Sequence, residues 1–188
     1  MKIVQLLPEL NEGGVERGVV ELNREYSKLG FDSIVISNGG KLDKQIDIDG
    51  GKHIKFDVCS KNIFTSIARI KALKKILKEL NPDIIHVRSR VPAWLVYFAN
   101  KNLNIKVVST VHGFNSVSFY SRIMTKADAV ICVSNSIKEY IQKHYNTEEE
   151  KITVIPRGID LELFNLKNID KEFISNFKDK FNLNDKYI

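Results

Sequence analysis

The stretch KIVQLLPELNEGGVERGVVEL, residues 2–22, decides the fold. Its first six residues form an apolar run that predicts a buried strand, and apolar residues recur at helical spacing after the pair Gly13-Gly14. Glycines at the start of a helix let a ligand approach the backbone closely, and the first helical N–H groups favour an anion. The stretch therefore predicts a phosphate or sugar site at a helix N-terminus. The alternative is that the glycines only make a tight turn.

Length and composition are those of an ordinary globular chain. It has 188 residues, of which 43% are hydrophobic and 28% charged, enough for one domain with a sizeable core. No apolar run approaches the roughly 20 residues that span a bilayer. The first residues form a strand rather than a signal peptide, so we expect a cytoplasmic protein. Cys59 and Cys132 have no metal-ligating neighbour at useful spacing, and no metal is expected.

The net charge of +6 predicts a mild attraction to anions such as anionic lipid or phosphorylated substrates. Much of the excess lies on one predicted helix, in Lys71, Lys74, Lys75 and Lys78. These lysines form either a solvated helix face or a contact with an anionic membrane surface or a phosphorylated glycan. Nucleic acid fits less well, because basic and aromatic residues do not interleave as they do in a stacking platform.

Strand and helix patterns alternate along the chain. The predicted strands are short and rich in Val and Ile, as in strands buried on both faces. They are Lys2–Leu7, Asp32–Ser37, His53–Asp57, Asp83–Val87, Lys106–Val111, Ala129–Val133 and Ile152–Ile155. This order predicts an α/β fold, a Rossmann-like doubly wound parallel sheet of about seven strands.

The clearest predicted helix runs over residues 63–80. One apolar stripe follows it, consisting of Ile63, Ile67, Ile70, Leu73, Ile76, Leu77 and Leu80. Asn81-Pro82 ends this helix. Gly30 is predicted to end the first helix, and Ser134 to cap the helix that carries Ile137.

The pattern changes after Phe164. We expect residues 1–164 to form the Rossmann-like domain, and residues 165–188 to be a linker and the start of a second domain. Residues 165–184 predict one amphipathic helix, and residues 186–188 look like the opening of another strand. The chain is therefore expected to be the first half of a longer protein.

Four segments follow predicted strands and are expected to gather at one edge of the sheet: 13–17, 88–90, 112–113 and 156–160. Arg88 and Arg90, beside Ser89, suit a phosphate or carboxylate, or else form a surface pair neutralised by nearby acidic residues. His86 is expected to lie in the strand packing.

His112 stands at a strand end, and Gly113 gives room beside it. It could donate to a sugar hydroxyl or act as an acid or base. The loop after it, which contains Tyr120 and Arg122, could shape an acceptor pocket.

Together these segments resemble the N-terminal half of a retaining glycosyltransferase of family 4, with the two-domain GT-B architecture. The resemblance rests on five ordered stretches: 7–17 with its two glycines, PDIIHVRS at 82–89, STVHG at 109–113, VICVS at 130–134 and VIPRGID at 154–160. The 7–17 and 88–90 segments look most like bacterial transferases of lipopolysaccharide or other cell-surface glycans. Many family members have Asn where Arg157 stands.

The resemblance implies transfer of a sugar from a nucleotide sugar, a UDP- or GDP-sugar, to a surface-glycan acceptor with retention, without metal or other cofactor. His112 would be the catalytic residue, hydrogen-bonding the transferred sugar. The acceptor would meet Arg88, Ser89, Arg90, Tyr120 and Arg122. The donor would meet Gly13, Gly14, Arg17, Gly113, Arg157, Gly158 and Asp160.

In such a family the C-terminal domain carries a two-glutamate motif and most of the donor site. The 188-residue chain is therefore expected to fold but not to catalyse alone, and a peripheral position at the inner membrane is expected. Two alternatives stay open: a nucleotide-sugar epimerase of GT-B shape, and a non-catalytic module that binds sugars or nucleotides.

Overall fold

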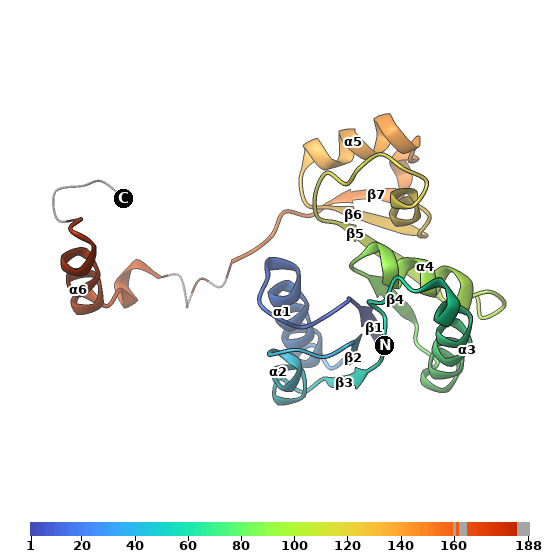
Figure 1. Cartoon of the computed structure of the whole chain (residues 1–188), viewed down its shortest axis with the longest axis horizontal. Helices are drawn as coiled ribbons and strands as arrows, with labels where there is room; N and C mark the ends of the chain where they lie inside the picture. Colours follow the sequence, from blue (N-terminus) through green and yellow to red (C-terminus); the bar gives the residue numbers. More distant parts are fainter. Residues whose placement is uncertain (160, 162–164, 184–188) are drawn as a thin grey trace. The chain divides into compact units, whose positions relative to one another are not determined.

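The computed structural model describes residues 1–159, 161 and 165–183. The chain divides into two compact units, Met1–Pro156 and Arg157–Ile188, and each is described on its own. The first unit contains a parallel seven-stranded sheet in the order β3-β2-β1-β4-β5-β6-β7 (Figure 1). The strands are β1 Lys2–Leu6, β2 Asp32–Ser37, β3 Lys52–Lys55, β4 Ile84–Val87, β5 Lys106–Val111, β6 Ala129–Cys132 and β7 Ile152–Val154. All seven predicted strands and the predicted fold class are confirmed.

The strand order reverses at the centre of the sheet. The chain runs outward from β1 through β2 to β3, then crosses back so that β4 pairs with the free side of β1. In open parallel sheets ligands bind at the carboxyl ends of the strands beside such a reversal. The segments that follow β1 and β4 therefore occupy the favoured position for a site.

Helices cover both faces of the sheet. Helices α1 (Gly14–Lys28) and α2 (Asp43–Ile48) lie on one face, and α3 (Ile63–Leu80) and α4 (Arg90–Ala99) on the other (Figure 1). This is the arrangement that right-handed crossovers produce. The remaining elements are α5 Asn135–Tyr145, α6 Lys171–Phe181 and the 3-10 turns η1 Ser121–Thr125, η2 Glu149–Lys151 and η3 Leu166–Asn168.

Local signals set the helix ends. Gly30 comes directly after Leu29, the C-cap of α1, and has φ of +75°, a left-handed conformation in which glycine carries no penalty. The Ser134 hydroxyl accepts a hydrogen bond from the backbone N–H of Ile137 at 3.3 Å, as expected of an N-cap. Both predicted helix signals are confirmed.

Two apolar clusters form the core. One contains Leu7, Val19, Val35 and Ile46 on the side of α1 and α2. The larger cluster joins alternate strand residues to α3, α4 and α5, and it includes the fully buried Cys132. Burial raises the pKa of the Cys132 thiol to about 11, so this thiol stays protonated. No helix in the described part of the chain is both long and apolar enough to cross a membrane.

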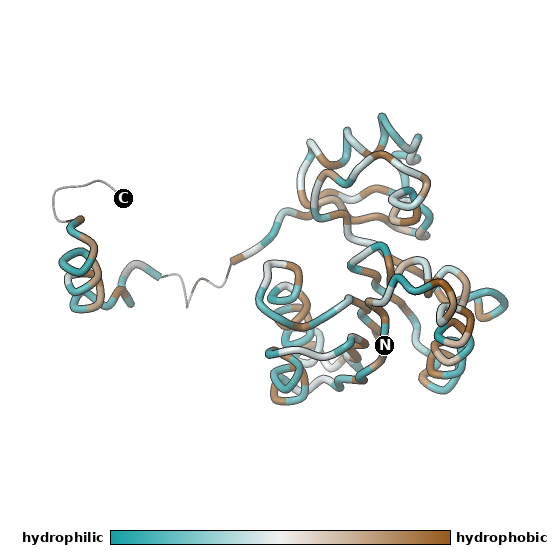
Figure 2. Tube along the Cα trace, viewed as in Figure 1, coloured by the Kyte–Doolittle hydropathy of each residue, from teal (hydrophilic) through white to brown (hydrophobic). Residues whose placement is uncertain are grey.

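The predicted apolar stripe on α3 is wrong at its first end. Leu73 and Leu77 are fully buried, but Ile63 and Ile67 are 80% and 66% exposed. A helix of 18 residues is about 27 Å long, whereas strands of four to six residues reach about 13–20 Å. The helix is thus longer than the strands it covers, and its first residues, from Ile63 to Ile67, extend beyond the core. Figure 2 shows apolar and charged positions mixed along this helix.

The second unit contains η3 and α6. One helix was predicted over residues 165–184, and α6 occupies Lys171–Phe181 of that range with Asp170 as its N-cap. The predicted strand at 186–188 and the predicted domain boundary at Phe164 lie outside the described residues. The two-domain assignment therefore stays a prediction.

Candidate functional site

The loop after β1 leads into α1, as the glycine pair predicts. Gly13 is the N-cap and has φ of −171°, which is extended backbone that any residue adopts. The constraint there is space, because a Cβ on Gly13 would collide with the carboxylate of Glu16. This carboxylate, on the third residue of α1, folds back over the helix N-terminus. A phosphate that binds at Gly13 and Gly14 would therefore have to displace the flexible Glu16 side chain.

The second candidate segment leaves β4 through a buried polar cluster. His86 is 3% exposed, and its Nε2 atom lies 2.7 Å from the Thr110 hydroxyl of β5. The guanidinium of Arg88 lies 3.5 Å from the same nitrogen, and Arg88 is 7% exposed. Burial, with the positive charges of Arg88 and His112, lowers the pKa of His86 to about 3. His86 is therefore neutral at physiological pH.

This cluster tests two predictions that were made from the sequence, one for His86 and one for Arg88. The prediction that His86 belongs to the strand packing is confirmed by its burial and its Thr110 partner. The alternative of a surface arginine pair is wrong for Arg88, because its side chain is buried. A buried guanidinium at the carboxyl edge of a sheet presents fixed positive charge to any anion that reaches it.

Arg90 lies in a different environment from the buried Arg88. It is the first residue of α4, and its guanidinium donates to the Ser121 hydroxyl at 3.1 Å and lies 5.3 Å from the centre of the Tyr120 ring. Trp94, one turn further along α4, donates its indole N–H to the backbone oxygen of Tyr120 at 3.1 Å. Arg90 and Tyr120 are thus brought together, and they fix the loop after β5 against α4. Ser89 is the N-cap of α4, and Arg122 is exposed in η1.

His112 comes directly after β5 and is half-buried. Its positive charge is the smallest of the three causes that lower the pKa of His86. A Cβ on Gly113 would meet nothing within 4 Å. The open space that was predicted beside His112 is present.

The carboxyl edge of the sheet thus gathers three of the four predicted segments. Strands β1, β4 and β5 are neighbours, so the loops at Gly13, Arg88 and His112 leave the sheet side by side (Figure 1). Arg157 and Gly158 belong to the second compact unit, and their placement relative to this edge is not defined. Asp160 lies outside the described residues. The exposed Arg17 belongs to the first turn of α1.

Sequence reasoning missed Thr110, Ser121 and Glu16. His86 pairs in register with Val108, so Thr110 lies two residues further on the same face of the adjacent strand. Glu16 stands three residues after the N-cap, the position from which a glutamate folds back over a helix start. That spacing was a usable signal.

The comparisons with known proteins give this arrangement a family. The sequence profile of Glycosyltransferase Family 4 matches residues 12–163. The chain belongs to this family. Among solved structures, a glycosyltransferase from Rickettsia africae is similar to this chain, with a TM-score of 0.82 and a sequence identity of 36%. The match covers 97% of this chain and 49% of the Rickettsia africae chain.

Two further relatives are informative. The UDP-Gal:alpha-D-GlcNAc-diphosphoundecaprenol alpha-1,3-galactosyltransferase of Escherichia coli is 29% identical to this chain over an alignment of 180 residues. The match covers 86% of this chain. Anabaena HepE in complex with UDP-glucose shares the fold, with a TM-score of 0.78 at 15% identity over 98% of this chain and 50% of the other. The chain spans about half the length of these relatives, 45% in the case of the Escherichia coli protein.

Proposed function

We propose that this chain is the acceptor-binding half of a retaining glycosyltransferase. The whole protein would transfer a sugar from a UDP- or GDP-sugar to a bacterial surface glycan, such as a lipopolysaccharide core or a lipid-linked precursor. The observation that carries this proposal is the family membership together with the three loops that meet at the carboxyl edge of β1, β4 and β5. The name of the Escherichia coli relative supports a UDP-sugar donor and a diphosphate-linked lipid acceptor.

In the proposed reaction one bond at the anomeric carbon of the transferred sugar is replaced by another. The bond between the anomeric carbon and the donor diphosphate breaks, and the bond to the acceptor oxygen forms on the same face of the sugar. The proton of the acceptor hydroxyl passes to the leaving diphosphate, which takes the electron pair of the broken bond. Negative charge builds up on the leaving diphosphate, so positively charged groups and helical N–H groups nearby lower the barrier. No metal or other cofactor is proposed.

Each candidate residue has a part in this scheme. Backbone N–H groups at Gly13 and Gly14 would bind the diphosphate after Glu16 has moved aside, with Arg17 supporting that loop. His112 would hydrogen-bond the transferred sugar, and the open space at Gly113 would admit it. Arg88, which is buried at the sheet edge, would supply fixed positive charge to a phosphorylated acceptor.

Other residues would complete the two halves of the site. On the acceptor side Ser89, Arg90, Tyr120 and Arg122 would line the pocket, and the contact between Arg90 and Tyr120 fixes part of its wall. On the donor side Arg157, Gly158 and Asp160 would contribute from the segment that leads to the second domain. We propose that this second domain holds most of the donor site and that the 188-residue chain alone is inactive.

The experiment is a transfer assay on the whole protein with candidate UDP- and GDP-sugars and lipid-linked acceptors. His112→Ala is expected to lower kcat by about 10²-fold or more, the contribution typical of a positioned acid, base or hydrogen-bond donor. His144→Ala is the matched control, because His144 is exposed on α5 and should leave kcat unchanged.

Three outcomes would contradict the proposal. Equal activity of the wild type and His112→Ala would remove His112 from the reaction. Conversion of the nucleotide sugar without any acceptor would favour an epimerase. Sugar transfer by the 188-residue chain alone would show that the acceptor half is a complete enzyme.

A further inference from the structure

The loop of residues 113–120 joins His112 to Tyr120, so it links the proposed catalytic residue to the proposed acceptor side of the site. The loop lies between β5 and η1 and contains no helix or strand of its own. A segment of this kind keeps its conformation only through contacts with the elements around it, because it has no ladder of backbone hydrogen bonds. The contacts that hold this loop therefore determine how His112 and Tyr120 are placed.

Two tyrosines of α5 hold the middle of this loop, which runs beside that helix (Figure 1). The Tyr140 hydroxyl donates to the backbone oxygen of Asn115. The Tyr145 hydroxyl donates to the backbone oxygen of Ser116 at 3.3 Å. The ring of Phe114 packs edge-to-face against Tyr140, with the ring centres 5.2 Å apart and the planes at 89°. Two successive carbonyl groups of the loop thus have their donors on one helix.

Both tyrosines are themselves fixed by the fold. Tyr145 is 8% exposed and belongs to the larger apolar cluster, and Tyr140 packs against that cluster. The two rings lie 6.3 Å apart. Burial, together with the neighbouring Tyr145, raises the pKa of Tyr140, so its hydroxyl stays protonated at neutral pH and can donate. Helix α5 thus presents two donors on a rigid support.

The far end of the loop is held by a different helix. Trp94 of α4 donates its indole N–H to the backbone oxygen of Tyr120 at 3.1 Å. The loop is therefore attached to α5 near its start and to α4 at its end. Asn115 comes only three residues after His112, a span of at most about 11 Å of extended chain. A change in the contacts with α5 is therefore expected to move His112 directly.

We infer that Tyr140 and Tyr145 are positioning residues, whose hydroxyl groups hold the loop after β5 and so fix His112 relative to the acceptor side of the site. They act through the backbone oxygens of Asn115 and Ser116 rather than on a substrate. A reacting group that is misplaced by about 1 Å can lower a rate by about 10²-fold, so the loop beside it needs a fixed backbone. The inference rests on the proposed function for its purpose. The attachment of the loop to α5 is a property of the 188-residue chain and is measured separately.

The first test removes the two hydroxyls and keeps the rings. The double variant Tyr140→Phe with Tyr145→Phe is compared with the wild type by ¹⁵N relaxation of the labelled 188-residue chain. Backbone order parameters of residues 113–118 are expected to be about 0.85 in the wild type and to fall to about 0.6 or below in the double variant. Residues of β1 should keep their values. Tyr140→Phe alone should give most of the effect, because the Tyr145 bond of 3.3 Å is long for an O–H donor and an oxygen acceptor.

The second test is the steady-state kinetics of sugar transfer by the whole protein. The double variant is expected to lower kcat by about tenfold or more and to raise the KM for the acceptor. The KM for the nucleotide sugar should stay the same, because we propose that most of the donor site lies in the second domain. A protein that is merely less stable would not show this split, since fewer folded molecules lower kcat and leave both KM values unchanged. Circular dichroism checks that the variant is folded under assay conditions.

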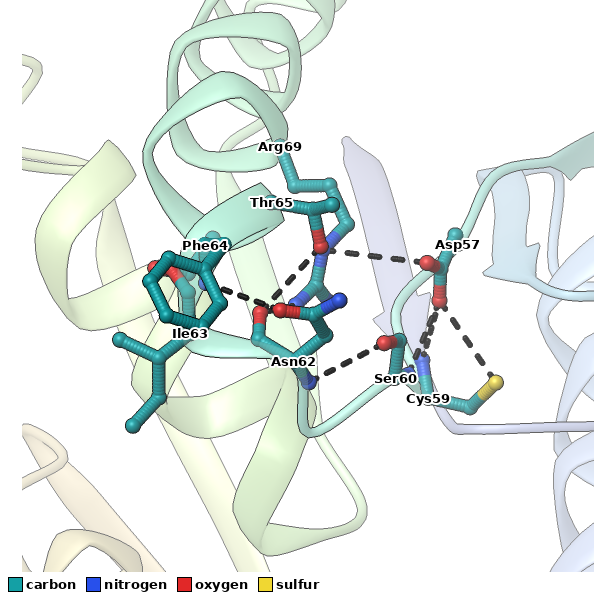
Figure 3. Close-up of polar contacts among 9 residues, drawn as sticks. Asp57, Cys59, Ser60, Asn62, Ile63, Phe64, Thr65 and Arg69 are labelled. Atoms are coloured by element: carbon teal, nitrogen blue, oxygen red, sulfur yellow. Dashed lines mark hydrogen bonds and ion pairs between the residues drawn. The ribbon is translucent and has the colours of Figure 1, made fainter.

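A matched control removes a hydroxyl that donates to a loop carbonyl elsewhere in the fold. Thr65, in the first turn of α3, donates its hydroxyl to the backbone oxygen of Asn62 at 3.2 Å, and Arg69 donates to the same oxygen at 3.0 Å (Figure 3). This segment follows β3, which three strands separate from β5 in the sheet. Thr65→Val should therefore keep the order parameters of residues 113–118, kcat and both KM values of the wild type.

The inference is overturned if residues 113–118 keep their order parameters in the double variant, because the hydroxyls would then not hold the loop. It is also overturned if the loop loosens while kcat and the KM for the acceptor stay at wild-type values, or if Thr65→Val gives the same kinetic change. A whole protein that transfers no sugar to any acceptor, but whose loop loosens in the double variant, would reject the proposed function and keep the attachment of the loop to α5.

Discussion

The cluster around His86 and the first exposed apolar residues of α3, Ile63, Phe64 and Ile67, depart in opposite ways from the rule that polar residues lie outside and apolar residues inside. We call these three residues of α3 the α3 tip. The first buries His86, Arg88 and Thr110 beside two strands, and the second exposes Ile63, Phe64 and Ile67 to solvent. Buried polar groups destabilise a fold unless they find partners, and His86 has one at 2.7 Å. Exposed apolar groups cost almost no folding stability, because the unfolded chain exposes them too. The polar groups of the first region thus find partners within the fold, whereas the side chains of the second lie in solvent.

The two regions should therefore respond differently to substitution. Changes in the His86 cluster should alter the free energy of unfolding, because its contacts exist only in the folded chain. Changes at the α3 tip should leave that free energy almost unchanged, because its side chains are exposed in the folded and in the unfolded chain. Each prediction below tests one side of this difference.

The largest difference in the free energy of unfolding is expected between substitutions at the buried end and at the exposed end of α3. Leu77→Ala should lower the free energy of unfolding by about 2–5 kcal/mol, because Leu77 is fully buried and the substitution leaves a cavity. Ile67→Ala, two-thirds exposed on the same helix, should change it by less than about 0.5 kcal/mol. Urea unfolding followed by circular dichroism measures both. Equal losses would mean that the first turns of α3 are packed and that the comparison is wrong.

The partner of His86 is tested by Thr110→Val, which keeps the side-chain shape and removes the hydroxyl. The substitution leaves Nε2 of a buried imidazole without its closest partner. We expect a loss of about 1–3 kcal/mol in the free energy of unfolding. The control is Thr153→Val on the edge strand β7, where the residue is exposed and only a small change is expected. A Thr110→Val protein as stable as the wild type would show that His86 does not depend on this bond.

The pH dependence of stability tests the burial of His86. Its pKa falls from an ordinary 6.5 in the unfolded chain to about 3 in the fold, so the unfolded state binds the proton more readily. Stability from this group is therefore fully present above pH 6.5 and is lost as pH falls toward 3. Between pH 7 and pH 5 the loss should be about 2 kcal/mol.

Urea unfolding of the wild type and His86→Gln at both pH values isolates this contribution. The two proteins differ only at position 86, so the difference between their losses reports on His86. The variant should lose less stability between pH 7 and pH 5 than the wild type does. Parallel losses in the two proteins would contradict a neutral, buried His86.

The sequence predicted the scaffold well and the side-chain environments less well. Parallel strands buried on both faces appear in the sequence as continuous runs rich in Val and Ile, so stretches such as Lys106–Val111 can be recognised as strands. The gathering of Gly13, Arg88 and His112 also followed from the sequence, because the carboxyl ends of parallel strands share one edge. The burial of Arg88 did not follow, since two arginines beside a serine fit a surface as well as an interior.

The bond between His86 and Thr110 needed the register of β4 against β5, which no local pattern contains. The exposed α3 tip was missed for a related reason. The periodicity of Ile63, Ile67 and Leu77 shows that they share a helix face, but it does not show how far the neighbouring strands reach. The exposure of the tip became visible only once helix and sheet were placed together.

The smallest effect on stability is expected at Asn62, the N-cap of α3. Asn62→Ala removes the side chain that accepts from the Phe64 N–H, and should lower the free energy of unfolding by about 1 kcal/mol. Asn62→Ser is the matched control, because serine also caps helices and should keep the stability of the wild type. Urea unfolding followed by circular dichroism measures all three proteins. Equal stability of Asn62→Ala and the wild type would show that this cap contributes nothing to the fold, and the contrast with the His86 cluster would then rest on exposure alone.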